Sequence, residues 1–168
     1  MKKVVVSALL VFGCVLLLLA ATLRLGWWPV AATATPPDWE NRLAQAALHA
    51  SLSRESAGLT NPLKPSNDVL LGGLKIFKSN CAGCHGTRNQ PSPWGTRGFY
   101  PRAPQFAGES PKLSAAQMFV AIKQGVRYSG MGAWEGMLSD EEMWKVATFL
   151  EHIGSLPPEV EAEFKTNQ

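Results

Sequence analysis

Hydrophobic residues form one continuous run near the N-terminus and recur with helical spacing in the second half of the chain. The run from Val4 to Leu23 contains no charge and predicts a single apolar helix. Later, apolar residues recur every three or four positions in segments 67–80, 114–124 and 139–153. Irregular Gly- and Pro-rich stretches separate these segments, so the pattern predicts an all-α domain with long loops.

The ends of two predicted helices carry capping signals. Ser114 with Gln117, and Ser139 with Glu142, have the spacing of a capping box, in which each side chain satisfies a free backbone N–H. Gly125 is expected to end the first of these two helices.

The N-terminal run has the features of a membrane anchor. Twenty helical residues span roughly 30 Å, the thickness of a bilayer core. Lys2 and Lys3 precede the run, and Trp27 and Trp28 follow it as an interfacial aromatic belt would. We therefore expect an uncleaved anchor over residues 1–26, spanning a bacterial inner membrane once, with the remainder facing the periplasm or cell exterior.

Two other interpretations of this end are weaker. A signal-peptide cleavage site at Ala32-Thr33-Ala34 would lie too far beyond the apolar run. Cys14 does not fit a lipoprotein cysteine, because the bulky Phe12 lies just before it and the chain after it stays apolar. We therefore expect Cys14 to be a small residue buried in the membrane.

The remaining boundaries follow from composition. Residues 27–66 are predicted to be a periplasmic linker with one helix over 38–53, whose N-cap would be Asp38. This helix is either a docking surface or a packed spacer. Residues 67–158 form the predicted domain, and 159–168 a C-terminal tail.

Charge and cysteine content exclude some classes of protein. The net charge of +3 is small and no Lys/Arg stripe is present, which argues against a nucleic-acid partner. With three cysteines in 168 residues, a framework of several disulfides is excluded.

Cys81, Cys84 and His85 occur within five residues. Their spacing puts the three side chains on one face of a helical turn. Two thiols there can form thioethers to the two vinyl groups of a haem, and the imidazole can ligate its iron. This is the signature of c-type haem attachment.

Three other kinds of site could also contain this motif. A zinc site needs further ligands, and His49 and His152 each stand alone. A thioredoxin-like dithiol expects a βαβ setting, whereas the flanks here are helical. A plain disulfide would leave the adjacent histidine without a role.

Met131 is the expected second ligand to the iron. It lies between Gly130 and Gly132 in a loop, where glycine lets the backbone approach a porphyrin closely. A thioether paired with histidine raises the haem potential. Met137 in the same loop is the main rival, with the two other histidines less favoured. Two further methionines fall in predicted helical stripes and are expected in the core: Met118 and Met143.

The segment 67–158 resembles the class I cytochromes c of the bacterial single-haem type. The matching features are Gly73 and Phe77 in a helix ending in CAGCHG, the loop SGMGAW, and a final helix LSDEEMWKVATFLEHI. The resemblance implies three or four helices around one covalent haem c, with the first and last helices crossing near Gly73, against Phe149. Gly132 departs from the family, which often has proline there.

The resemblance also implies residues around the haem. Pro104 matches a proline whose carbonyl accepts the other ring N–H of the ligating His85. Trp134 is expected in the pocket wall, and Arg127 beside a haem propionate.

A haem ligated on both faces has no vacant position for a substrate. We therefore expect a one-electron carrier rather than an enzyme, acting alone or as the cytochrome subunit of a respiratory or dehydrogenase complex, with redox proteins as partners. A peroxidase-like haem enzyme or gas sensor with a labile sixth ligand is the alternative.

Overall fold

The computed structural model of the chain describes residues 1–107 and 109–166. The chain divides into two compact units, Met1–Ala34 and Thr35–Gln168, which are described separately. The finer division expected from the sequence, with boundaries at residues 26 and 66, stays a prediction.

The first unit contains helix α1, Lys2–Arg24, none of whose residues is buried. Within the described residues, α1 is the one helix long and apolar enough to cross a membrane. Its length and composition are those of a membrane anchor and equally those of a signal sequence near an N-terminus.

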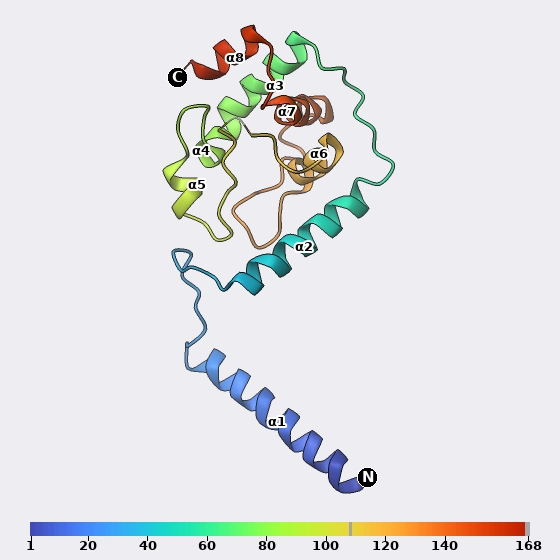
Figure 1. The fold of residues 1–168 in the computed structure, drawn as a ribbon, viewed down its shortest axis with the longest axis vertical. Helices are drawn as coiled ribbons and strands as arrows, with labels where there is room; N and C mark the ends of the chain where they lie inside the picture. The colour runs from blue at the N-terminus through green and yellow to red at the C-terminus, as the bar shows by residue number, and fades with distance from the viewer. Residues whose placement is uncertain (108, 167–168) are drawn as a thin grey trace. The chain divides into compact units, whose positions relative to one another are not determined.

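The second unit is helical (Figure 1). The described parts of this unit contain no sheet, and their β-type pairing is an isolated bridge between Glu135 and Leu138. The predicted all-α fold is therefore confirmed. Its helices are α2 Asp38–Glu55, α3 Asn67–Asn80, α4 Ala82–His85, α5 Pro93–Arg97, α6 Ala115–Gln124, α7 Asp140–His152 and α8 Pro158–Lys165.

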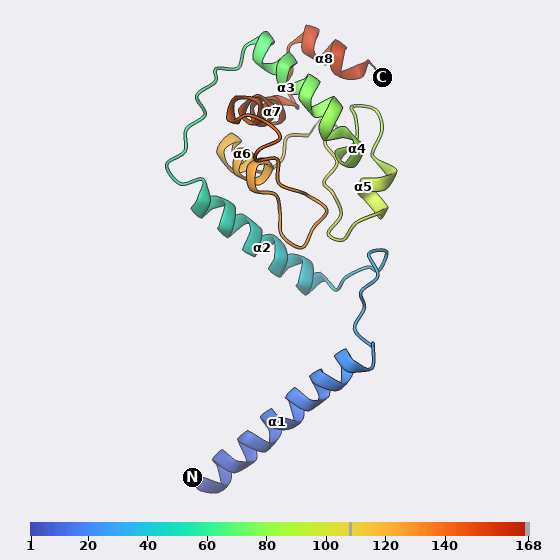
Figure 2. The same cartoon turned by 180° about the vertical axis from the view of Figure 1, so that it is seen from behind.

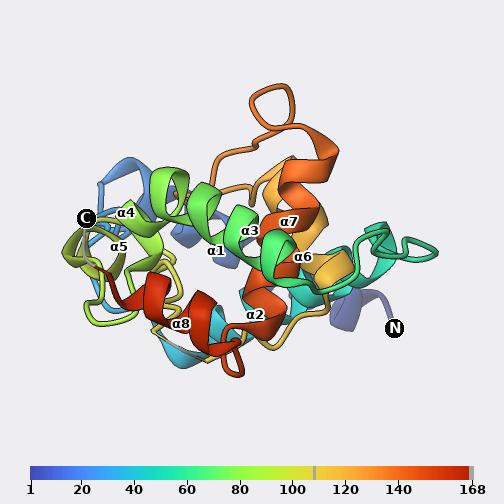
Figure 3. The same ribbon diagram turned by 90° about the horizontal axis from the view of Figure 1, so that it is seen from above.

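Helices α3 and α7 cross at Gly73 (Figure 3). A Cβ atom on Gly73 would lie 2.7 Å from the carbonyl carbon of Lys145 and 2.8 Å from the Cβ of Phe149, too close for any side chain. The expected close crossing against Phe149 is thus confirmed. Because glycine costs helix stability elsewhere, its use here reflects the space between two backbones.

Both predicted capping boxes are present. Ser114 and Gln117 exchange hydrogen bonds at the start of α6, and Ser139 and Glu142 do the same for α7. Gly125 ends α6 with φ 70°, a conformation that glycine adopts without strain.

Helix α2 packs against α6 and begins one position earlier than expected (Figure 2). Pro37 is the N-cap, because its carbonyl accepts the first helical hydrogen bond, and Asp38 is the first helical residue rather than the cap. Leu52 is buried, whereas Trp39 and Leu43 are 58% and 65% exposed. Trp39 and Leu43 have the spacing of one helical face, but that face does not point to the core.

The described part of the segment predicted as a C-terminal tail, 159–168, contains most of helix α8, Pro158–Lys165, and its boundary stays a prediction. Pro157 and Pro158 follow α7, and a proline pair in that position usually marks the end of a helix. Pro158 instead occupies the first turn of a new helix, where a missing N–H costs nothing. Val160 and Phe164 are buried, and the Phe164 ring packs edge-on against the rings of Phe77 and Phe149.

Candidate haem-binding site

The turn that carries the two cysteines and the histidine joins α3 directly to α4. The amide of Cys81 donates to Phe77 O (2.8 Å), and the amides of Cys84 and His85 donate to Cys81 O (3.0 and 2.9 Å). Both thiols are free and half-buried. Gly86, with φ 75°, ends the turn and redirects the chain. The three side chains thus come from one short, hydrogen-bonded turn.

The His85 ring is fixed by two neighbours. Its Nδ1 lies 2.8 Å from Pro104 O. A carbonyl oxygen can only accept, so Nδ1 carries the proton and donates, and Nε2 keeps its lone pair. The ring also stacks on Phe106, with centroids 4.8 Å apart and planes 8° apart, and the Phe106 amide donates to His85 O (3.1 Å). Nε2 is therefore a pre-oriented metal-binding atom.

Burial sets the protonation of this turn. Burial lowers the pKa of His85, against a smaller opposing effect of the hydrogen bond to Pro104, which favours the neutral imidazole that binds metals. Burial, together with the nearby Cys84, raises the pKa of Cys81 to about 12. Because dithiol exchange needs a thiolate, this protonated thiol argues against a thioredoxin-like role.

Residues that the sequence analysis did not identify contact the backbone of this turn. Helix α5 approaches so closely that a Cβ on Gly95 would lie 2.8 Å from the carbonyl carbon of Cys84. The side-chain amide of Gln105 donates to Cys84 O (3.0 Å), and its oxygen accepts from the Ser92 amide (2.7 Å). The Ser92 hydroxyl donates to Gly83 O. Ser92 followed by proline is a helix-start signal, but nothing in the sequence marks Gln105.

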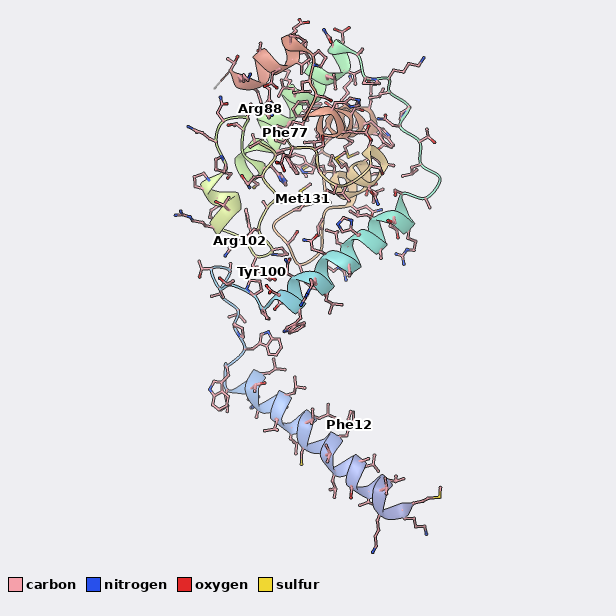
Figure 4. The ribbon with its side chains drawn as sticks, viewed as in Figure 1. Phe12, Phe77, Arg88, Tyr100, Arg102 and Met131 are labelled. Carbon is pink, nitrogen blue, oxygen red and sulfur yellow. The ribbon has the colours of Figure 1, made fainter. Side chains whose placement is uncertain are left out.

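The loop between α6 and α7 contains Met131 (Figure 4). Met131 is half-buried against the core, and its carbonyl accepts from the Val126 amide (2.9 Å). Gly130 lies against the ring of Phe99, so the loop contacts the segment that follows α5. Met137, the rival ligand, is 66% exposed. Two methionines are buried in the core as expected: Met118 and Met143.

The two remaining predicted site residues are Trp134 and Arg127. Trp134 is half-buried against the core, and its backbone amide donates to Ile122 O (3.1 Å). Arg127 is exposed, with its guanidinium 5.9 Å from the ring centroid of Tyr128. The structure thus brings His85 and Pro104 together, whereas the roles of Trp134 and Arg127 stay predictions.

The donor set fits a haem better than a protein-bound metal ion. The described part of the chain contains no group of three His, Cys, Asp or Glu side chains able to enclose an ion. Two free thiols beside an imidazole with an available Nε2 match covalent attachment and ligation of one macrocycle. A soft thioether, as in Met131, is a common partner for such an imidazole.

Residues 69–150 match the family model described as cytochrome c oxidase, cbb3-type, subunit III. A search of curated proteins finds no match. Among solved structures, a chain of the Kuenenia stuttgartiensis reducing HAO-like protein complex is similar, with 23% identity and a TM-score of 0.48. That similarity covers 57% of this chain and 47% of the other, and it supports no conclusion here. The family match does: residues 69–150 form a c-type cytochrome domain, which binds haem and transfers electrons.

Proposed function

We propose that this protein is a membrane-anchored electron carrier with one haem, attached through Cys81 and Cys84 and ligated by His85 and Met131. The hydrogen bond between His85 Nδ1 and Pro104 O carries this proposal. It fixes the tautomer whose Nε2 can ligate iron, and it needs no reorganisation when the haem is bound.

Each residue has a separate task in this arrangement. A bound haem supplies a one-electron couple. Cys81 and Cys84 fix the macrocycle to the turn, and Pro104 orients the imidazole of His85. Phe106 covers one face of that imidazole and limits the access of water to it. No acid or base has to act, because electron transfer leaves every bond in place.

Met131 is a better sixth ligand than Met137 because of its surroundings. Met131 is half-buried in a loop that is closed by hydrogen bonds within its own backbone, and Gly130 of this loop contacts Phe99. Met137, by contrast, is largely exposed. A thioether in a less hydrated position favours the reduced iron, which raises the potential.

Ligation is tested by optical spectra of the purified protein with Met131→Ala, using Met137→Ala as the matched control. The weak sulfur-to-iron band of the oxidised form should disappear in Met131→Ala and persist in Met137→Ala. The reverse result would assign the ligand to Met137. A high-spin spectrum of the wild-type protein would favour a haem enzyme or gas sensor with an open sixth position.

The cofactor count is tested by the pyridine haemochrome spectrum of the denatured protein. We expect one haem per chain that stays with the polypeptide in acid acetone. Cys84→Ala should leave a single thioether and shift the haemochrome band, whereas a haem extracted from the wild-type chain would contradict covalent attachment.

The anchor is proposed to be α1, on the length and apolarity of Lys2–Arg24. The haem domain would then face the periplasm, close to redox partners in the same membrane. N-terminal sequencing of protein extracted from membranes with detergent should find the run intact. A mature N-terminus beyond residue 24, in protein released without detergent, would show that the segment is a signal sequence.

A further inference from the structure

Helix α8 lies outside the segment that matches the cytochrome family, yet it contacts the chain just beyond the haem-attachment turn. Its C-terminal end is fixed to α3 by Lys78, whose ammonium donates to Glu163 O (2.7 Å), Glu163 Oε1 (2.9 Å) and Thr166 O (3.1 Å). Only 11% of the Lys78 side chain is exposed. Helix α8 is therefore a docked element with its own partners.

Arg88 links α8 to both segments that surround His85. Its Nε and Nη2 lie 3.0 and 2.9 Å from Glu161 Oε1 on α8, and its Nη1 donates to Ala107 O (3.4 Å). Arg88 is three residues after His85, and Ala107 directly follows Phe106. One guanidinium thus joins the chain leaving the haem turn, the segment that orients the imidazole, and α8.

This ion pair is partly buried. The side chains of Arg88 and Glu161 are 23% and 19% exposed, and the guanidinium lies 5.8 Å from the centroid of the Phe164 ring (Figure 4). An ion pair that is shielded from water and geometrically fixed is worth more than an exposed one. Lys165 contacts the same carboxylate from the solvent side (3.1 Å), with its own side chain 58% exposed.

An aromatic path runs in parallel with the ion pair. The ring of Phe164 on α8 packs against Phe77 (6.2 Å between centroids), Phe77 packs against Phe106 (6.4 Å), and Phe106 stacks on His85. Helix α8 therefore reaches the imidazole through two sets of contacts, which meet where Arg88 lies over the ring of Phe164.

We propose that Arg88 and Glu161 are positioning residues for His85: through them α8 fixes segments 86–90 and 104–107, and hence the orientation of the imidazole. This inference rests on the proposed role of His85 as an iron ligand. In this proposal the ion pair acts on His85 through the backbone on both sides of the ligand.

The test is amide hydrogen exchange in the full-length protein as isolated in detergent. The Phe106 amide, which donates to His85 O, and the Thr87 amide, which donates to Gln90 O, report the two segments. Exchange of both should be about tenfold faster in Arg88→Gln and in Glu161→Gln. The double variant should be no faster than the faster of the two single variants, because both substitutions break the same pair.

Lys165→Gln is the matched control, since it removes an ion pair to the same carboxylate without touching residues 86–90 or 104–107 through its side chain. Its Phe106 exchange should equal that of the wild type. Equal acceleration of every amide, including Val146 in the core of α7, would mean that the pair contributes only global stability. That outcome, or unchanged exchange at Phe106, would overturn the proposal.

A second measurement separates this inference from the proposed function. In haem-loaded Arg88→Gln and Glu161→Gln the reduction potential should fall, because a looser segment admits water, which favours the more highly charged ferric iron. An unchanged potential with faster Phe106 exchange would show that the pair orders the segment but does not position the ligand, and would refute the proposal. Protein isolated with no covalent haem would instead refute the proposed function, and the exchange data would still report on the ion pair.

Discussion

Substitution of Gly95 by alanine tests how tightly α5 packs against the turn proposed to attach the haem. The added Cβ would lie 2.8 Å from the carbonyl carbon of Cys84 and 2.9 Å from Nε2 of Gln105, and closer still to Cys84 O. Ordinary contacts begin at 3.4 Å, so relieving the contact with the Cys84 carbonyl carbon alone requires α5 or the turn to move by 0.6 Å (3.4 − 2.8), and relieving the contact with Cys84 O requires a larger movement. The side chain of Gln105 cannot move away freely, because it also accepts a hydrogen bond from the Ser92 amide. Cys84 O cannot move freely either, because it accepts a hydrogen bond from Gln105.

Three contributions set the size of the effect. Overpacking against backbone costs about 1–3 kcal/mol. Weakening of the bonds from Gln105 to Cys84 O and from Ala103 to Gly95 O costs about 1 kcal/mol each. Alanine in a helix returns about 1 kcal/mol relative to glycine. The free energy of unfolding should therefore fall by about 2–4 kcal/mol.

The assay is urea unfolding followed by the Soret absorbance. For a urea dependence of about 2 kcal/mol/M, the midpoint should fall by about 1–2 M. Gly83→Ala is the matched control: it lies in the same turn, but its Cβ would meet nothing within 4 Å. A midpoint for Gly95→Ala at or above that of the wild type, or an equal loss in Gly83→Ala, would refute the packing argument.

Three further substitutions test the frame around the site. Gly73→Ala should lower the free energy of unfolding by about 1–3 kcal/mol, because its Cβ would meet α7 backbone, whereas Gly72→Ala, which meets only the flexible end of a lysine, should be close to neutral in the same urea titration. Phe164→Ala should cost about 3–5 kcal/mol through the cavity it leaves beneath α8, seen as a lower midpoint of thermal unfolding. Glu161 is partly desolvated, which raises its pKa, but hydrogen bonds and charges from the two neighbouring cations lower it overall. Its stabilisation is thus complete above the unfolded pKa of about 4.3 and is lost as pH falls through the lower folded value. The free energies of unfolding of the wild type and of Glu161→Gln should therefore converge as the pH falls below about 4.3, and a constant difference would contradict this.

Local signals in the sequence predicted the helices that frame the site. Ser114 and Ser139 mark helix starts through capping boxes, and both helices begin there. Capping signals act over one or two helical turns, so a single sequence can carry them. The close crossing at Gly73 was implied instead by the resemblance to class I cytochromes c, and the structure confirms it.

The sequence was less informative where a residue depends on distant partners. Pro157 and Pro158, at the start of α8, have the pattern of a helix stop. The helix is stabilised by the burial of Val160 and Phe164, where α8 packs on α3 and the Phe164 ring meets Phe149 of α7. The stripe containing Trp39 and Leu43 has helical spacing, but α2 packs through Leu52 on its other side. Neither outcome can be read from local spacing, because each depends on surfaces formed elsewhere in the chain.

The two proposed ligands lie in differently constructed parts of the domain. His85 is oriented by residues at positions 104 and 106, and α8 reaches the same segments through Arg88 and Glu161. The loop of Met131 is held mainly by short-range bonds between residues 126 and 131, with Phe99 as a long-range neighbour. Segments with few long-range contacts open at lower free energy than those joined to the core. The imidazole side is therefore the fixed part of the site, and differences in ligation among conditions or variants should arise first on the side of Met131.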